Sequence, residues 1–334
     1  MKLIVPMAGR GTRLRPHTHV TPKPLLPVAG RTMVERIVET FASVLPRALD
    51  EAVFILGPDF GDAVRQSLTE ISARHGMRAH FAVQERALGT GHAVLEAADH
   101  LTGECVVVFA DTLFAMDEPP DLDADAVVWV KHVDDPRRFG VVVKDGERIT
   151  AFVEKPETPI SHEAIIGIYY LRDGAALRAA LQHLMDEDVR GVGGEYQLTD
   201  ALDRLLREGA VFKTASVSEW LDCGTIPALM ETSRLVLDKE RSDEKQGTVE
   251  NSTLVEPVFV GPDARITDSV IGPYAAIHGG AVIKNSVVRN SIVFDRATVE
   301  DAALDDALVG QHAVVRGFAG TLNVGDHATV GPAD

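Results

Sequence analysis

Cysteine, aromatic side chains and long apolar runs are all scarce in this chain. Its 334 residues include two cysteines, and Phe, Trp and Tyr together make up 5% of them. Two cysteines cannot build a disulfide framework, and Cys105, inside an apolar run, is expected to be a buried hydrophobic residue. The apolar stretches are too short for a transmembrane helix or a signal peptide. We therefore expect a cytoplasmic protein with no membrane partner.

Positively charged residues are also fewer than negatively charged ones. The chain carries 33 Lys and Arg against 50 Asp and Glu, which gives a formal net charge of −17. A surface this acidic repels a polyanionic backbone, so a nucleic-acid partner is not expected. Phosphorylated small molecules remain compatible with it, because a few local cations and Mg²⁺ can offset a distant acidic surface.

Strand-like and helix-like segments alternate over residues 1–235. This alternation predicts a Rossmann-like α/β fold with a mostly parallel sheet covered on both faces, in which ligands bind beyond the carboxyl ends of the strands. The expected strands are residues 2–6, 52–56, 79–83, 105–109, 126–131, 140–143, 149–153 and 165–171. The expected helices are residues 33–44, 60–74, 91–98, 175–185, 198–208 and 226–245.

The pattern changes at about Asn251, where single aliphatic residues begin to recur every five or six positions. Asn-Ser pairs at Asn285 and Asn290 suit tight corners, and every third aliphatic lies sixteen or seventeen residues further on. This spacing predicts a short left-handed parallel β-helix of hexapeptide repeats, with one inward aliphatic on each of three faces. A β-sandwich is the alternative, although its period would be two. The repeating aliphatics are Val260, Ile266, Ile271, Ile277, Ile283, Val288, Val293, Val299, Leu304, Val309 and Val315.

These patterns predict three parts. A catalytic domain is expected over residues 1–235, a linker helix over 236–250 that includes the connector 241–247, and the β-helix over 251–334. A short β-helix of this kind is more typical of an assembly module than of a second active site, so we expect a homo-oligomer.

The loop after the first expected strand combines small residues with cations. It reads Met7-Ala8-Gly9-Arg10-Gly11-Thr12-Arg13-Leu14, and Thr21-Pro22-Lys23-Pro24-Leu25 follows. Small residues after a buried strand let backbone N–H groups turn toward an anion, and Arg13 and Lys23 could hold phosphates on either side of a reacting centre. The loop is not a Walker A motif, because no Gly-Lys-Ser/Thr follows, and Leu14 occupies the third glycine position of the dinucleotide fingerprint.

Other candidate residues lie near the ends of expected strands. Asp111 follows the apolar run Val107-Val108-Phe109, where a carboxylate suits Mg²⁺, and Asp222 lies in Trp220-Leu221-Asp222-Cys223-Gly224-Thr225. Gln84 opens the segment Gln84-Glu85-Arg86-Ala87-Leu88-Gly89-Thr90-Gly91, and its amide offers the donor and acceptor that a pyrimidine edge demands. Three more segments are Phe139-Gly140, Val153-Glu154-Lys155-Pro156 and Gly194-Glu195-Tyr196.

Taken together, these motifs resemble those of the sugar-1-phosphate nucleotidyltransferases, close to the glucose-1-phosphate thymidylyl- and uridylyltransferases. The resemblance implies that Arg13 holds the leaving pyrophosphate, while Lys23 and Lys155 orient the sugar phosphate. It implies that the nucleoside triphosphate is bound by Ala8, Gly9, Gly11, Thr12, Gln84, Gly89 and Thr90. It implies that the sugar is bound by Gly140, Glu154 and Glu195, and Mg²⁺ by Asp111 and Asp222.

The implied reaction is transfer of a nucleotidyl group from dTTP or UTP to a sugar-1-phosphate, with glucose-1-phosphate the leading acceptor. No protein nucleophile is required, because positioning and charge neutralisation supply the catalysis. Two alternatives stay open. One is a non-catalytic regulatory subunit that binds sugar nucleotides, and the other is a bifunctional enzyme whose β-helix transfers acyl groups with His278, His312 or His327.

Overall fold

The computed structural model describes residues 1–9, 11–240 and 246–332, and the contacts within it divide the chain into two compact units. Unit 1 consists of Met1–Arg10 and Val34–Trp220, and unit 2 consists of Gly11–Met33 and Leu221–Asp334. The domain boundaries given by the sequence patterns stay a prediction, and residues 241–245 of the expected connector lie outside the described residues. Among the helices described, none combines the length and apolar character that a membrane span requires.

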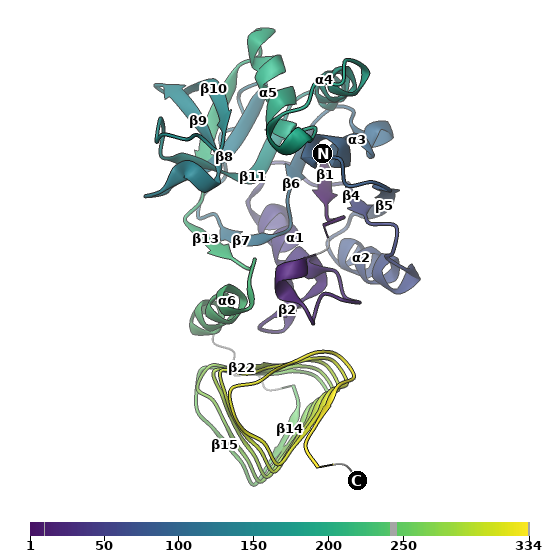
Figure 1. The fold of residues 1–334 in the computed structure, drawn as a ribbon, viewed down its shortest axis with the longest axis vertical. Helices are drawn as coiled ribbons and strands as arrows, with labels where there is room; N and C mark the ends of the chain where they lie inside the picture. The colour runs from purple at the N-terminus through teal and green to yellow at the C-terminus, as the bar shows by residue number, and fades with distance from the viewer. Residues whose placement is uncertain (10, 241–245, 333–334) are drawn as a thin grey trace. The chain divides into compact units, whose positions relative to one another are not determined.

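Unit 1 is built on a nine-stranded sheet in the order β5-β4-β1-β6-β11-β8-β12-β10-β9 (Figure 1). The strands β5, β4, β1 and β6 pair in parallel, as predicted. Beyond them the sheet is mixed, because β11 runs antiparallel to both β6 and β8, and β10 runs antiparallel to both β12 and β9. The strands are β1 (Lys2–Pro6), β4 (Glu51–Leu56), β5 (Arg78–Val83), β6 (Cys105–Val108), β8 (Ala126–His132), β9 (Gly140–Asp145), β10 (Arg148–Glu154), β11 (Glu163–Leu171) and β12 (Phe212–Ser216).

Helices cover both faces of this sheet. On one face α3 (Thr90–Leu95), α4 (Gly174–Asp186) and α5 (Leu198–Arg207) pack against inward residues of β1, β4 and β6 in one hydrophobic cluster. Successive side chains of a strand point to opposite faces, so alternate residues of β1 and β4 serve the other face. That face carries α1 (Met33–Val44) and α2 (Asp62–Arg74), and Phe41 of α1 packs at 5.3 Å from the ring of Phe114.

The expected elements of unit 1 all form, with boundaries shifted by at most a few residues. Cys105 is fully buried, as predicted, and burial raises the pKa of its thiol to about 12. Three short strands were not expected, namely β7 (Thr112–Ala115), β12 and β13 (Glu219–Asp222). The sequence of β12, Phe-Lys-Thr-Ala-Ser, has one large apolar side chain, so its strand character depends on parallel pairing with β8 rather than on a local pattern.

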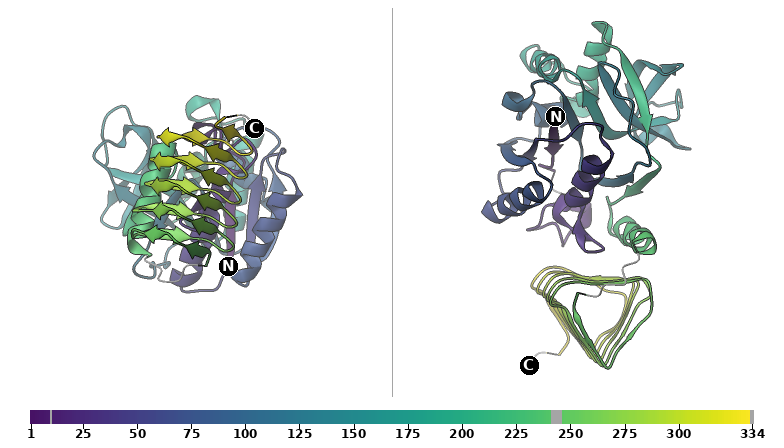
Figure 2. Two further views of the ribbon diagram at one scale, coloured as in Figure 1. Left: turned by 90° about the horizontal axis from the view of Figure 1, so that it is seen from below. Right: turned by 180° about the vertical axis from the view of Figure 1, so that it is seen from behind.

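Unit 2 contains a parallel β-helix of three sheets, each made of short parallel strands (Figure 2). Thr248 pairs with Arg265, 17 residues on, and Val314 pairs with Thr329, 15 residues on, so each coil brings the chain back to the same face. The first sheet holds β14 (Thr248–Glu250), β17 (Arg265–Thr267), β20 (Val282–Lys284), β23 (Thr298–Glu300), β26 (Val314–Arg316) and β29 (Thr329–Val330). The second holds β15 (Thr253–Leu254), β18 (Val270–Ile271), β21 (Val287–Arg289), β24 (Ala303–Asp305) and β27 (Ala319–Gly320). The third holds β16 (Val258–Val260), β19 (Ala275–Ile277), β22 (Ser291–Val293), β25 (Leu308–Val309) and β28 (Asn323–Val324).

The repeating aliphatics form the interior of this helix, as predicted. All eleven are buried in one cluster, and the corner residues Asn285 and Asn290 have φ of 44° and 47°. Asn and Asp tolerate this left-handed backbone better than most residues, which explains why they recur at the turns between faces. The spacing of five to six residues is therefore that of hexapeptide coils, and the arrangement fits a left-handed β-helix rather than a sandwich.

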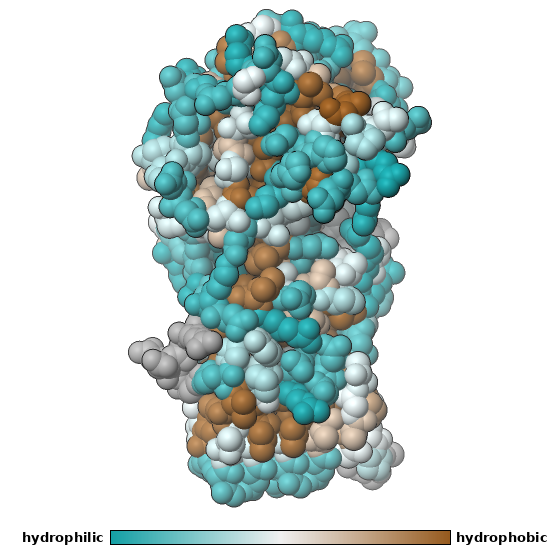
Figure 3. All heavy atoms as spheres, turned by 90° about the vertical axis from the view of Figure 1, so that its left-hand side faces the viewer, coloured by the Kyte–Doolittle hydropathy of each residue, from teal (hydrophilic) through white to brown (hydrophobic). Residues whose placement is uncertain are grey.

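The three outer faces of the β-helix differ in chemistry. The first sheet presents charged side chains such as Lys284 and Arg316, whereas the second exposes Val270 and Val287 at 39% and 40%. Hydrophobic residues gather on the β-helix in the view of Figure 3. The central residues of the third sheet point outward yet are buried, as Ile292 is at 1% exposure.

Residues from the beginning of the chain cover this third sheet. Within unit 2, Pro16 packs over Gly325, and the ring of His17 lies edge-on to Phe294 at a centroid distance of 5.6 Å. His17 Nε2 is 2.6 Å from Asn323 Oδ1, a contact that joins residues 306 positions apart. The segment also contains β2 (Pro27–Val28) and β3 (Arg31–Thr32), and α6 (Ile226–Lys239) packs against β2. The helix α6 ends at Lys239, whereas the sequence pattern predicted a helix that continues to residue 245.

The buried His17 makes stability depend on pH. Burial lowers the pKa of His17 below its ordinary value, and the hydrogen bond to Asn323 and the charge of Asp326 oppose this only in part. The unfolded chain therefore takes up a proton at about pH 6.5 that the folded chain resists. We expect the melting temperature to fall as the pH drops from 7.5 through 6.5 to 5.5. The fall should be smaller in His17→Gln than in the matched exposed variant His19→Gln. Identical pH profiles for the two variants would contradict this.

Candidate active site

The glycine-rich loop leaves the carboxyl end of β1 and crosses from one unit to the other. Ala8 and Gly9 belong to unit 1, whereas Gly11, Thr12, Arg13 and Lys23 belong to unit 2. Gly11 adopts φ 56°, and its carbonyl accepts hydrogen bonds from Leu14 N at 2.9 Å and from Thr18 Oγ1 at 2.7 Å. These bonds close a tight turn, which starts the 3-10 helix Thr12–Leu14.

Unit 2 brings the two predicted phosphate-binding cations to one side of this turn. Lys23, in the 3-10 helix Lys23–Leu25, is 9% exposed, and its Cβ approaches Gly11. Arg13 is exposed and extends toward the segment that follows β13. A methyl group at Gly224 would lie 3.7 Å from Arg13 Nη2 and 2.9 Å from Asp222 Oδ1. The predicted pyrophosphate ligand Arg13 and the predicted metal ligand Asp222 thus both lie close to Gly224.

Local hydrogen bonds hold Asp222 in this position. Its Oδ1 accepts a hydrogen bond from Gly224 N at 2.7 Å, and its carbonyl accepts one from Thr232 Oγ1 at 2.7 Å. Thr225 caps α6, because its Oγ1 accepts from Ala228 N. The carboxylate itself is exposed and supplies the oxygen ligands that a hard divalent cation prefers.

In unit 1, Gln84 follows the last residue of β5 and is 8% exposed. Its Nε2 lies 3.1 Å from the carbonyl of Gly89 and 3.1 Å from Nδ1 of His92. His92 Nε2 faces Glu96 at 3.4 Å, which favours the tautomer protonated on Nε2 and leaves Nδ1 as an acceptor. Both hydrogens of the Gln84 amide are then used within the loop, and Oε1 is the remaining polar atom of the side chain.

The loop that contains Gly89 is clamped to the segment that contains Glu195. Gly91 N donates to Tyr196 O at 2.8 Å, and Tyr196 N donates to Leu88 O at 2.9 Å. Gly89 has φ 123°, and a Cβ there would lie 2.7 Å from Tyr196 N, so only glycine fits. The structure therefore places the predicted base-binding loop beside the predicted sugar ligand Glu195.

The Thr90 hydroxyl makes two hydrogen bonds within the protein, and its predicted contact with the nucleotide stays a prediction. Its Oγ1 donates to Gln197 Oε1 at 3.0 Å and accepts from Leu198 N at 3.0 Å. Leu198 is the first residue of α5, so the Thr90 hydroxyl caps that helix from another part of the chain. These bonds occupy the hydroxyl, which leaves the main chain of Thr90 as the group with which it could contact a nucleotide.

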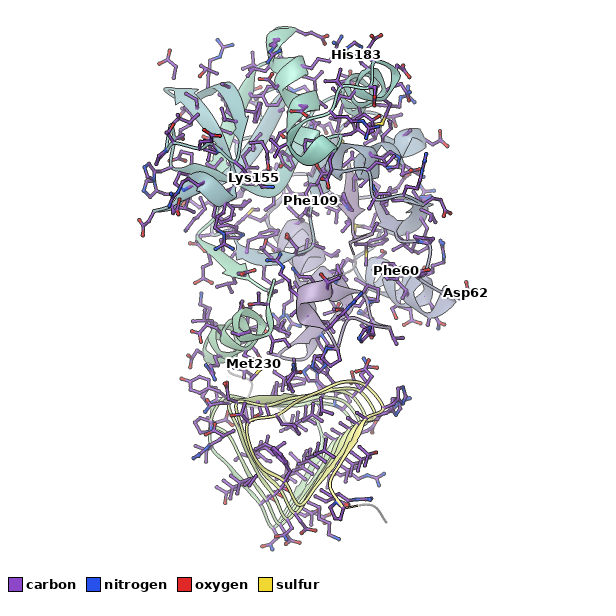
Figure 4. All side chains as sticks on the ribbon, viewed as in Figure 1. Phe60, Asp62, Phe109, Lys155, His183 and Met230 are labelled. Atoms are coloured by element: carbon purple, nitrogen blue, oxygen red, sulfur yellow. The ribbon has the colours of Figure 1, made fainter. Side chains whose placement is uncertain are left out.

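Glu154 and Lys155 lie at the end of β10 (Figure 4). Their charged atoms are 3.6 Å apart, and Lys155 adopts φ 44°, an uncommon backbone for a residue with a Cβ. A Cβ on Gly140 would lie 2.8 Å from Glu154 Oε2. Glycine at this position therefore lets the Glu154 carboxylate lie against the main chain, and Lys155 N donates to Phe139 O at 3.1 Å.

Asp111, which follows β6, has the same buried neighbour as Glu154. Burial raises the pKa of Tyr169, and the charges of Glu154 and Asp111 add to this effect. Both carboxylates therefore act on one side chain of β11. Phe109 lies edge-on to Tyr169, and its backbone N donates to Gly167 O at 2.9 Å, next to the bulge in β11.

The structure thus sorts the candidate residues into two sets. Unit 2 gathers the set Gly11, Thr12, Arg13, Lys23 and Asp222. Unit 1 holds the set Ala8, Gly9, Gln84, Gly89, Thr90, Asp111, Gly140, Glu154, Lys155 and Glu195. Sequence reasoning missed Tyr169 and Tyr196, because they contact segments far away in the chain. It also missed the orienting role of His92, which is near Gln84 in the chain but depends on the folded geometry of the loop.

Glycine turns and acidic residues beyond the carboxyl ends of parallel strands define a phosphate-handling α/β enzyme. The chain belongs to the nucleotidyl transferase family, whose model matches residues 2–239. It is 30% identical over 302 residues to a glucose-1-phosphate thymidylyltransferase of Streptomyces antibioticus, covering 86% of this chain and 80% of that one. It is 31% identical over 257 residues to the bifunctional protein GlmU of Methanocaldococcus jannaschii, covering 77% of this chain and 59% of the other.

A solved structure is similar as well. The structure is described as that of a glucose-1-phosphate thymidylyltransferase from Bacillus anthracis in complex with a sucrose. It superposes with a TM-score of 0.58 at 27% identity, over 73% of this chain and 98% of that one. The predicted family and fold class are thereby confirmed.

Of the three histidines of the β-helix, His278 is buried, whereas His312 and His327 are exposed. His278 is 3% exposed and lies between the rings of Phe259 and Phe294, at 5.5 and 5.8 Å. His312 and His327 stack on each other at 4.9 Å, at equivalent corners of successive coils. The ring contacts give buried His278 a packing role, and His312 and His327 contact each other on the surface.

Proposed function

We propose that the protein transfers a nucleotidyl group from dTTP or UTP to a sugar-1-phosphate and releases pyrophosphate, with glucose-1-phosphate the leading acceptor. The proposed choice of base rests on the orientation of the Gln84 side-chain amide. Its amide hydrogens point to Gly89 and His92, so it offers the acceptor Oε1 to a ligand. Thymine and uracil present an N3–H donor, whereas cytosine presents a lone pair at N3. This arrangement favours dTTP and UTP over CTP.

The other candidate residues supply positioning and charge. The acceptor's phosphate oxygen attacks the α-phosphorus in line, and pyrophosphate leaves. Arg13 holds the pyrophosphate, and Lys23 and Lys155 orient the sugar phosphate and offset its charge. Glu154, fixed against Gly140, receives sugar hydroxyl groups, with Glu195 beside the base loop. The regulatory-subunit alternative is less favoured, because this chain retains both lysines, Arg13 and both aspartates.

A matrix of substrates tests this proposal. Pyrophosphate release is measured for dTTP, UTP, CTP, GTP and ATP, each with glucose-1-phosphate. We expect kcat/KM for dTTP and UTP to exceed that for the other three by about a hundredfold or more, because a mismatched edge leaves buried polar groups unpaired. His92→Phe releases the Gln84 amide and should narrow the gap between UTP and CTP. The same exchange at His183, on α4, is the control. A preference for GTP or ATP would overturn the assignment.

We propose that the divalent ion of the reaction is Mg²⁺ and that Asp111 and Asp222 bind it. Both carboxylates are exposed and offer oxygen ligands, which fits a hard cation. Such an ion supplies charge neutralisation between the phosphate groups.

We also propose that the enzyme is cytoplasmic, because its proposed substrates are phosphorylated.

Asp111→Asn and Asp222→Asn keep the side-chain shape but weaken metal binding. Each is expected to lower kcat by about a hundredfold or more at saturating Mg²⁺, with circular dichroism unchanged. Glu118→Gln, an exposed carboxylate in the chain after β7, is the matched control. Turnover near that of the wild type in either folded aspartate variant would exclude that residue as a metal ligand.

We propose that the second sheet of the β-helix joins copies of the chain into a homo-oligomer. Val270 and Val287 are stacked in register on this sheet and exposed, followed by the exposed Ala303 and Ala319. A second copy is the occupant that fits, because a regular aliphatic face can pack against an identical one.

Light scattering of the full chain at micromolar concentration is expected to give a multiple of 36.0 kDa. The double variant Val270→Glu, Val287→Glu places charge in the middle of the face and should dissociate the assembly. Lys284→Glu, on the charged first sheet, changes charge without touching this face and should leave the mass unaltered. A monomeric wild type would contradict the proposal.

A further inference from the structure

A cluster of two histidines and a carboxylate lies at the amino ends of the parallel strands of unit 1. Glu51 is the first residue of β4, His80 lies in β5, and His100 ends the 3-10 helix Ala98–His100. One ligand atom from each lies within 4.8 Å of the others. The candidate nucleotide residues follow the carboxyl ends of the same strands, so the cluster belongs to the opposite edge of the sheet.

The distances within this cluster are those of metal ligands rather than of hydrogen bonds. Glu51 Oε2 is 3.5 Å from His100 Nδ1 and 3.8 Å from His80 Nε2. A hydrogen bond between a ring nitrogen and a carboxylate spans about 2.8 Å. Tetrahedral zinc with bonds of about 2.0–2.1 Å separates its ligands by about 3.3 Å. The three atoms therefore leave room for an ion between them.

One of the atoms that face this space lacks a hydrogen-bond partner in the part of the chain that the structure describes. Nε2 of His80 is closed off from solvent and has no hydrogen-bond partner among the described residues. The rings of His80 and His100 have centroids 4.5 Å apart, a close approach that places two ring nitrogens on one carboxylate oxygen. Buried polar atoms are normally paired, so this one calls for a ligand.

Neighbouring cations fix the ligands without occupying the space. Arg78 donates to Oε1 of Glu51 at 3.0 Å, which leaves Oε2 directed to the histidines. Lys2 Nζ donates to the carbonyl of His100 at 3.1 Å and to that of Thr102 at 3.0 Å, and so anchors the segment that carries His100. The three ligands come from β4, β5 and the segment before β6, so a bound ion would link these elements.

We propose that Glu51, His80 and His100 bind a divalent transition-metal ion of the zinc class, with water completing a tetrahedral site. Two imidazoles and one carboxylate are an established zinc donor set and are a poor match for Mg²⁺. Because the site lies at the opposite edge from the candidate catalytic residues, its role is to stabilise the sheet. The site and its role are independent of the proposed nucleotidyl transfer.

The test uses the full chain with any affinity tag removed, stripped with EDTA and dialysed. ZnCl₂ is titrated by calorimetry in excess Mg²⁺, which occupies sites made only of carboxylates. We expect one zinc ion per chain with a dissociation constant in or below the micromolar range. His80→Ala and His100→Ala should each weaken binding by at least about tenfold, and Glu51→Gln should also weaken it. Zinc should raise the melting temperature of the wild type more than that of the variants.

The control is the double variant His132→Ala, His162→Ala. The rings of His132 and His162 also lie close together, with centroids 5.4 Å apart, but His162 Nδ1 faces the Val133 carbonyl rather than a shared carboxylate. Binding should be unchanged in this variant. Co²⁺ substitution adds a readout that needs no mutant, because a tetrahedral site gives an intense visible absorption band. The proposal is overturned if the wild type binds no zinc in this range, if its cobalt form lacks that band, or if the control loses as much affinity as His80→Ala.

Discussion

The strand β1 lies between β4 and β6 in parallel register, and its residues Leu3, Ile4 and Val5 have no exposure to solvent. A strand buried on both faces can place polar groups only beyond its ends. Parallel pairing then brings the chain segments after β1, β5 and β6 to one edge of the sheet. Ala8 and Gly9, Gln84 and Asp111 each follow one of these strands, so this pairing determines which residues can act together on a phosphorylated ligand.

The β-helix has a part in this arrangement that its repeat pattern does not reveal. Its inward aliphatics fix the coils, and the third outer face thereby becomes a rigid surface. Pro16 and His17 pack on that surface, a few residues after Arg13 and before Lys23. The segment that carries both proposed phosphate-binding cations is thus supported by the β-helix within unit 2. The β-helix therefore supports this segment in addition to its proposed role in assembly.

The sequence indicates the elements of the fold more completely than their contacts. The range of β1 and the interior of the β-helix follow from apolar periodicity, which is a local property. The clamp of Gly91 on Tyr196 and the contact of His17 with Asn323 join segments about a hundred and about three hundred residues apart. Periodicity carries no information on such pairs. The bulge of β11 lies between Ile165 and Tyr169, where Gly167 has a φ of 82°.

Gln84 could be identified but not oriented from its sequence for a different reason: the residues that orient its amide are near it in the chain, but their geometry is set by the folded loop. An isolated amide can present either its oxygen or its nitrogen to a base, and the two choices recognise different edges. Here Glu96 selects the tautomer of His92, His92 accepts from Gln84, and Gly89 accepts as well. Under the proposed assignment of Gln84, the orientation of its amide is set two side chains away, by the Glu96 carboxylate that selects the protonated nitrogen of His92. In the proposed function, base specificity depends on a chain of polar contacts whose outermost member, Glu96, does not need to touch the nucleotide.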